Sequence, residues 1–194
     1  MNIFCRYIIL ALFLFLLSPF SAAQRAEAVV VGDINFADST AVGDQAVPLR
    51  NAALYRYLSL ISVYAAGLYL PVEAEGDFCR ADTPKRLELS YLVEISAADF
   101  VRSASHVLGK NLSPEERAAL ADRIETLHQA YRDVEKGDRY SLTYIPEHGT
   151  ELALNGNVLA KVVGADFACA YFGIWLGGDP IDDGLRDKLL RLRE

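Results

Sequence analysis

The chain has 194 residues, and 52% of them are hydrophobic. This length is enough for one domain with a substantial core. The formal net charge of −7 at pH 7 makes nucleic acid and strongly anionic lipid surfaces poor partners, because charges of like sign repel.

The N-terminus carries the pattern of a secretory signal. Residues 1–6 include a basic side chain, and residues 7–17 form a continuous apolar run that is short for a membrane span. Small residues follow, and cleavage is expected after Ala23 or Ala28. We therefore predict a signal peptide over residues 1–28, export to the periplasm of a Gram-negative host, and no stable membrane insertion after cleavage. An uncleaved anchor is the alternative interpretation.

The mature chain, residues 29–194, is predicted to be one domain and keeps two of the three cysteines, Cys79 and Cys169. An oxidising compartment permits these two side chains to form a disulfide. Sequence spacing alone does not place their Cα atoms within bonding reach. Two separate thiols that pack as small apolar side chains are therefore an equal alternative.

Strand signals dominate the first half of the mature chain. Residues 32–46 are polar and rich in small side chains, which predicts a surface loop. Residues 54–70 are rich in Leu, Ile, Val and Tyr, and predict either one long bent strand or two strands in a tight pair. Residues 87–93 alternate between apolar and polar side chains, as in a strand with one solvated face.

Helices are predicted in the middle of the chain. Ser96 is expected to cap a helix over residues 97–108 that stops at Gly109. Ser113 opens the capping-box sequence Ser-Pro-Glu-Glu of a second helix, whose apolar stripe runs as far as Tyr131.

The last third of the chain returns to strands. Residues 140–144 alternate in polarity, and apolar runs flank Asn155-Gly156, which is the strongest short-range signal for a hairpin. Two more helices are predicted over residues 165–172 and 185–192. Strands, then helices, then strands indicate an α+β fold: an antiparallel sheet with a layer of helices on one face.

Arg56 is the candidate for chemistry, because on a strand it would share a face with Leu54 and Leu58. A guanidinium among leucines is costly unless it meets an anion. One hypothesis is an internal ion pair, or a head group that reaches water from the strand end. The other is an anchor for a ligand carboxylate at the bottom of an apolar cleft, since the planar guanidinium suits a carboxylate.

Several segments carry a resemblance to a known family: Arg56, 64–70 (YAAGLYL), 140–146 (YSLTYIP), 149–152 (GTEL), 164–167 (GADF) and 173–177 (GIWLG). Together they resemble the bacterial secreted branch of the chalcone isomerase-like family, over nearly the whole mature chain. The resemblance implies a curved antiparallel sheet layered with helices, with a ligand cleft between the two. It also implies a choice, because the family divides into true isomerases and non-catalytic binders of fatty-acid-like ligands.

Residue by residue, the resemblance makes Arg56 the pocket arginine that orients an anionic substrate or holds a carboxylate. Tyr64 stands where the isomerases have a threonine, and Phe100 stands where they have a catalytic tyrosine. Ser103 and Val107 replace their lysine and asparagine. Phe100 has no hydroxyl with which to polarise a carbonyl. Tyr64 and Tyr91 are the nearest phenols that could substitute, or else they are ordinary aromatic residues of the core or rim.

These observations lead to a predicted function. We expect non-catalytic binding of a small amphipathic or fatty-acid-like carboxylate, with Arg56, Tyr64, Tyr91 and Phe100 as ligand-binding residues. The sequence shows no metal-binding or cofactor-binding motif, so we expect no cofactor, and protein partners remain undetermined. Two alternatives are an isomerase of the chalcone isomerase type, acting as an intramolecular lyase, and an envelope interaction module without a ligand.

Overall fold

The computed structural model describes residues 28–193, so the predicted signal peptide lies outside the described residues except for Ala28. The strands within the described range are β1 (Val29–Val31), β2 (Ile34–Phe36), β3 (Ser39–Val42), β4 (Gln45–Tyr57), β5 (Ile61–Tyr69), β6 (Lys85–Tyr91), β7 (Arg139–Ile145), β8 (Gly149–Leu154) and β9 (Asn157–Val162). The α-helices in the same range are α1 (Ala97–Asn111), α2 (Pro114–His128), α3 (Ala165–Leu176) and α4 (Asp183–Leu190).

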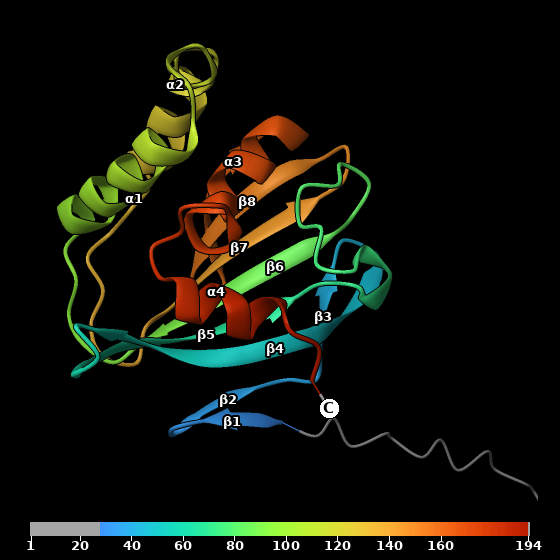
Figure 1. Cartoon of the computed structure of the whole chain (residues 1–194), viewed down its shortest axis with the longest axis vertical. Coiled ribbons are helices and arrows are strands. Elements are labelled where there is room, and N and C mark those ends of the chain that lie inside the picture. The colour runs from blue at the N-terminus through green and yellow to red at the C-terminus, as the bar shows by residue number, and fades with distance from the viewer. Residues whose placement is uncertain (1–27, 194) are drawn as a thin grey trace, which may run out of the picture.

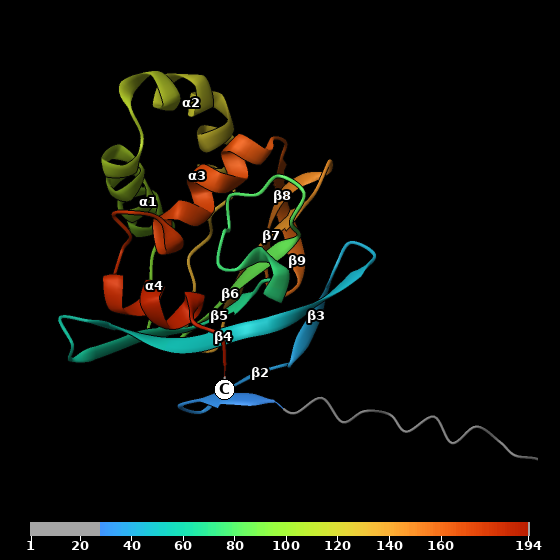
Figure 2. The same ribbon diagram turned by 45° about the vertical axis from the view of Figure 1, so that its right-hand side comes forward.

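One antiparallel sheet organises the described part of the chain. Its strands follow one another from β3 to β9 in chain order, so every strand pairs with its neighbour in sequence. The sheet curls, and the helices cover one of its faces (Figures 1 and 2). The α+β fold predicted from the sequence is therefore confirmed. The predicted hairpin at Asn155-Gly156 is also present, between β8 and β9.

The opposite face of the sheet is covered by the N-terminal segment. Strands β1 and β2 form a hairpin that lies beneath β4 in Figure 1, away from the helices. Phe36 of β2 is fully buried there, beside Leu49, Ala65 and Tyr69 of β4 and β5. The surface loop predicted for residues 32–46 is thus wrong. Small residues in that segment make tight turns between short strands, and its few large side chains close a second apolar core.

The helix starts were predicted well and the helix ends less well. The Ser96 side chain accepts a hydrogen bond from the Asp99 amide, and Ser113 completes its capping box with Glu116. However, α1 runs through Gly109 to Asn111, because the glycine keeps helical geometry there instead of ending the helix. Helix α3 also continues past the predicted end, to Leu176. Its last turn carries residues that line the cleft described below.

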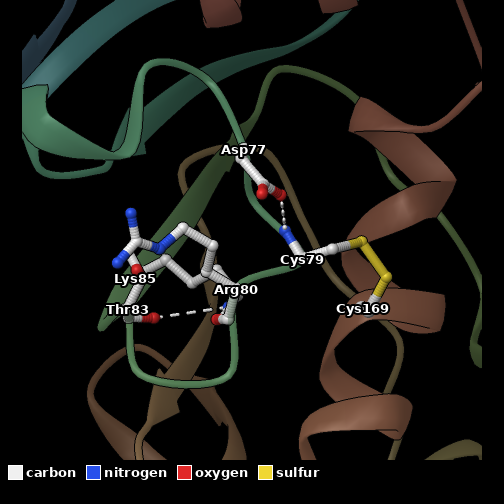
Figure 3. The surroundings of a disulfide bond; sticks show 6 residues. All are labelled: Asp77, Cys79, Arg80, Thr83, Lys85 and Cys169. Carbon is white, nitrogen blue, oxygen red and sulfur yellow. Dashed lines mark hydrogen bonds between the residues drawn. A yellow bond between two sulfur atoms is a disulfide. The ribbon is translucent and has the colours of Figure 1, made fainter.

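A disulfide joins the segment between β5 and β6 to helix α3. The bond links Cys79 with Cys169, whose Cα atoms are 4.6 Å apart (Figure 3). The Asp77 carboxylate accepts a hydrogen bond from the Cys79 amide at 3.0 Å and fixes the approach to the cysteine. Two segments separated by 90 residues are therefore held together at the edge of the helical layer.

Lys85 lies in the same region, at the start of β6, and its side chain is only 1% exposed. Its ammonium group donates to the carbonyl oxygens of Arg80 and Thr83, both at 3.3 Å, and lies 4.2 Å from the ring centre of Tyr144. Burial lowers the pKa of Lys85 to about 8, against the weaker opposing influence of nearby carboxylates. The unfolded chain would hold this proton up to about pH 10.4.

This difference predicts a pH-dependent stability. Between about pH 8 and about pH 10.4 the unfolded chain binds more protons at Lys85 than the folded chain, so rising pH favours the folded state. Relative to Lys85→Met, the wild-type free energy of unfolding should rise by about 2 kcal/mol from pH 7 to pH 9.5, measured by urea denaturation. Lys136→Met, at an exposed position, serves as the matched control. The difference in free energy of unfolding between the wild type and this variant should stay constant from pH 7 to pH 9.5. A constant difference between wild type and Lys85→Met would contradict the prediction.

Candidate ligand-binding cleft

A cleft of about 860 Å³ opens between the sheet and the helical layer. This volume falls within the range of about 300–1,000 Å³ that is typical of small-molecule sites. The sheet side is lined from β4, β5 and β6, and the helical side from α1 and α3. The residues that line it and bear on its chemistry are Tyr55, Tyr57, Tyr64, Tyr91, Asp99, Phe100, Arg102, Ser103, His106, Tyr131 and Trp175.

The sheet wall of the cleft is aromatic. Tyr64 of β5 lies directly opposite Tyr91 of β6 in the antiparallel register, so both rings point toward the helices. The rings of Tyr55 and Tyr64 stack with their centres 4.9 Å apart, and Tyr91 meets Phe100 of α1 edge to face at 5.4 Å. These contacts lock the ring orientations and give the cleft a preformed apolar surface.

The helical wall is hollow because α1 presents small side chains there. Phe100, Ser103 and Ala104 are spaced at three and four residues and share one face of the helix. Phe100 closes the inner end of the cleft, while Ser103 and Ala104 leave room in front of it. Trp175, from the last turn of α3, completes this wall.

Among the five tyrosines that line the cleft, Tyr64 and Tyr91 bring buried phenol groups to its sheet wall. The Tyr64 hydroxyl accepts a hydrogen bond from the indole nitrogen of Trp175 at 3.1 Å, which leaves its own proton free to be donated. The Tyr91 hydroxyl has no hydrogen-bond partner among the described residues, although the side chain is 2% exposed. Burial raises the pKa of Tyr64 and of Tyr91 well above that of an ordinary phenol. Both groups therefore stay neutral at physiological pH and can offer a hydrogen-bond donor to a ligand.

Charged groups line the cleft only at its rim, as far as residues 28–193 are concerned. Asp99 and Arg102, on the exposed side of α1, form an ion pair, and the exposed His106 stands one turn beyond Arg102. An unpaired charge buried deeper would be costly. The cleft therefore combines an apolar interior with two neutral donors and a charged, solvated mouth. Among the same residues, no cluster of His, Cys, Asp or Glu could hold a metal ion.

Arg56 is not among the residues that line the cleft, so the structure does not support the hypothesis of a carboxylate anchor there and agrees with a head group that reaches water from the strand end. It stands between Tyr55 and Tyr57, which both line the cleft, so strand alternation turns it to the opposite face of the sheet. Its side chain is exposed and makes no hydrogen bond or ion pair among the described residues. Near this point β4 and β5 extend past the helical layer, and the nearby Leu58 and Leu60 are exposed, so they form no buried wall around Arg56 (Figure 2).

The buried arginine of β4 is Arg50, which is 6% exposed. Its Nε atom donates to the Leu190 carbonyl at the end of α4, at 2.6 Å. Arg50 therefore caps a helix C-terminus, where a cation is favoured, and does not line the cleft.

The other predicted site residues come together. Tyr64, Tyr91 and Phe100 form contiguous parts of the cleft wall. The sequence did not indicate that Ser103 leaves space in the wall or that Trp175, which is buried in the core, also lines the cleft. The helical spacing of Ser103 from Phe100 was a usable signal. No sequence signal could bring Trp175 to Tyr64, which is 111 residues away.

A second, small void of about 30 Å³ lies behind the aromatic wall. It shares Leu89, Tyr91, Phe100, Tyr131 and Trp175 with the main cleft and is otherwise lined by three further leucines and by Tyr140. The aromatic side chains thus separate the cleft from a pocket of unfilled space deeper in the core.

A family model described as chalcone isomerase-like matches residues 28–191. The chain belongs to the chalcone isomerase-like family. No curated protein matches it significantly in sequence. Among solved structures, a fatty-acid binding protein of Arabidopsis thaliana shares the fold with a TM-score of 0.65 and 21% sequence identity. The similarity covers 84% of this chain and 96% of the plant chain.

Membership of the chalcone isomerase-like family explains the position of the cleft between sheet and helices, where the resemblance placed it. Phe100, which the resemblance aligns with the catalytic tyrosine of the isomerases, lines the cleft. Arg56, which the resemblance makes the pocket arginine, is not among the lining residues.

Proposed function

We propose that this protein binds a small amphipathic carboxylate, of the fatty-acid type, without transforming it. The observation that carries the proposal is an apolar cleft of about 860 Å³ that has neutral donors inside and charge only at its mouth. Burying about ten methylene groups would contribute on the order of 8 kcal/mol before ordering costs. The apolar walls therefore supply most of the affinity, and the plant relative, itself a fatty-acid binding protein, supports the same ligand class.

The charges suggest how such a ligand lies. A carboxylate in the interior would meet the phenol donors of Tyr64 and Tyr91 but no cation, which leaves its charge poorly compensated. At the mouth it would remain hydrated and meet Arg102 and His106. We therefore place the alkyl tail inside and the head group at the rim. This orientation replaces the predicted anchoring by Arg56.

The isomerase alternative receives less support from the same residues. Phe100 brings no hydroxyl to the cleft, and the raised pKa values of Tyr64 and Tyr91 leave no phenolate near neutral pH to act as a base. Turnover of a chalcone by the purified protein would favour the enzyme over the binder.

Ser103→Trp tests the proposal by filling the cleft from α1. The indole would occupy the space in front of Phe100, so binding of parinaric acid, a fluorescent fatty acid, should weaken by about tenfold or more. Ser105→Trp, at an exposed position of the same helix outside the cleft, is the matched control and should bind as the wild type does. The proposal fails if the wild type shows no binding and carries no lipid by mass spectrometry after gentle purification. Equal affinity in both tryptophan variants would place the ligand elsewhere.

We also propose that the chain is exported to the periplasm and belongs to the secreted bacterial branch of the family. The apolar run at residues 7–17 and the disulfide support this location, because disulfides persist in oxidising compartments. Within residues 28–193 no helix is long and apolar enough to cross a bilayer. The mass of the protein isolated from its host would show whether cleavage occurs after Ala23 or Ala28.

A further inference from the structure

The turn between β4 and β5 carries a cluster of exposed apolar side chains. We name Tyr57, Leu58, Leu60 and Ile61 the apolar tip. Leu58 is 73% exposed and Leu60 is 84% exposed, and the other two are more than half exposed. The hairpin projects beyond the helical layer (Figure 2). Other large exposed apolar residues of the described chain, such as Val158 and Val163, lie on separate elements.

The backbone of the turn does not explain these residues. Leu58 and Ser59 have φ values of 49° and 60°, and the Leu60 amide donates to the Tyr57 carbonyl at 3.1 Å, which makes Leu58 and Ser59 the two central residues of a β-turn. Turns with positive φ favour Asn and Gly, and a leucine there is disfavoured. Neither the backbone conformation nor burial in the free protein explains why position 58 carries a leucine. We infer that this apolar side chain makes a contact with a molecule outside the chain.

The apolar tip adjoins the mouth of the cleft. Tyr57 belongs to both, because its ring lines the cleft while the residue begins the turn. Anything that approaches the tip therefore also approaches the opening through which a ligand enters.

The charge of the β4–β5 hairpin and the small size of the apolar tip favour a lipid bilayer over a protein as the partner. From residue 51 to residue 72 Arg56 is the sole charged side chain, in a chain of net charge −7, so carboxylates are absent from the hairpin. A protein partner typically needs about 800 Å² of surface on each side, and a projecting turn of five residues is small for that. A bilayer interface accepts a narrow apolar projection, with Tyr and Arg at the level of the lipid head groups.

We propose that the apolar tip dips reversibly into the surface of a phospholipid bilayer, with Arg56 on lipid phosphates. The evidence for docking comes from the apolar tip alone. The role that we assign to docking, the exchange of an amphiphile between the bilayer and the cleft, rests on the proposed function. The contact is shallow and does not amount to stable insertion, which agrees with the acidic character of the rest of the chain.

Sedimentation with vesicles of phosphatidylethanolamine and phosphatidylglycerol tests the docking. The variant Leu58→Asn/Leu60→Asn removes the two most exposed leucines, and Asn suits the positive φ at residue 58. We expect its partition to vesicles to fall by about tenfold, since partial burial of two leucine side chains is lost. Arg56→Gln should weaken vesicle binding by a smaller factor than the double variant does. Added salt should reduce the difference in vesicle binding between the wild type and Arg56→Gln. Val158→Asn, at an exposed position of another hairpin, should sediment as the wild type does.

Two further measurements separate the possible failures. Parinaric acid binding in solution should be equal in the wild type and in Leu58→Asn/Leu60→Asn, because neither leucine lines the cleft. Docking is overturned if the wild type does not sediment with vesicles, or if the double variant sediments equally well. It is also overturned if sedimentation velocity without lipid shows a wild-type dimer that the double variant abolishes, because the tip would then be a surface for self-association. None of these outcomes alters the result of the ligand-binding test.

Discussion

Replacing both Cys79 and Cys169 by alanine is expected to lower the free energy of unfolding by about 4–5 kcal/mol. The bond closes a loop of 90 residues, and a cross-link of that length removes much of the conformational entropy of the unfolded chain. Loss of packing should add little, since Cys79 is exposed and Cys169 is only half-buried. Chemical denaturation of the oxidised wild type and of the double variant measures the difference.

Reduction provides the control for this prediction. Dithiothreitol should shift the denaturation midpoint of the wild type to near that of the double variant, and it should leave the variant unchanged. Equal midpoints for oxidised and reduced wild type would contradict the prediction. Single alanine variants would leave one free thiol, so the double variant gives the cleaner comparison.

The disulfide also bears on the cleft. Cys169 lies in the same helix as Ile174 and Trp175, which line the cleft one to two turns later. Helix α3 is otherwise held by fully buried apolar side chains such as Phe167 and Phe172. We therefore expect the double variant to bind parinaric acid with nearly wild-type affinity at low temperature, and to lose binding only as it unfolds.

Local sequence patterns accounted for the elements whose structure is decided locally. The hairpin at Asn155-Gly156 and the caps at Ser96 and Ser113 each depend on a few adjacent residues, and all three are present. Residues 32–46 depend on distant partners instead. Strand β2 pairs with β1 and packs Phe36 against β5, and strand β3 pairs with β4. The local sequence of residues 32–46 is polar and rich in small residues, and by itself it does not indicate these strands.

The site shows the same division. The resemblance named Tyr64 and Tyr91, and the register of β5 and β6 places them opposite each other on one face of the sheet. Alternation along β4 could not say which of its faces is covered, or where the helical layer stops. The sequence therefore left two hypotheses for Arg56 open, and the exposed side chain agrees with a head group that reaches water. The pairing of β4 with β5 also shifts register between Tyr55 and Arg56, which a pattern of alternating residues does not reveal.

Phe36→Ala is expected to destabilise the fold by about 3–5 kcal/mol, because the ring is fully buried between the N-terminal hairpin and the sheet.

Gly67, in the segment 64–70 that carries the family resemblance, packs directly against the Phe36 ring, and the absence of a side chain there leaves space for the ring. A Cβ atom at Gly67 would lie 2.5 Å from Cδ1 of Phe36, which is closer than real contacts allow. Gly67→Ala alone should therefore cost about 2 kcal/mol through forced displacement of the ring and its hairpin.

The two substitutions together test whether this contact is the reason for the glycine. In the Phe36→Ala background the space is empty, so Gly67→Ala should be neutral or slightly stabilising, since alanine suits a strand better than glycine by about 0.5–1 kcal/mol. A double-mutant cycle from urea denaturation should then give a coupling energy of about 2 kcal/mol or more. Gly178→Ala, where an added Cβ meets nothing within 4 Å, should have the same small effect in both backgrounds. Additive costs for Gly67→Ala and Phe36→Ala would refute the steric explanation. Because Phe36 and Gly67 meet on the face opposite the helices, parinaric acid binding should persist in every variant that remains folded.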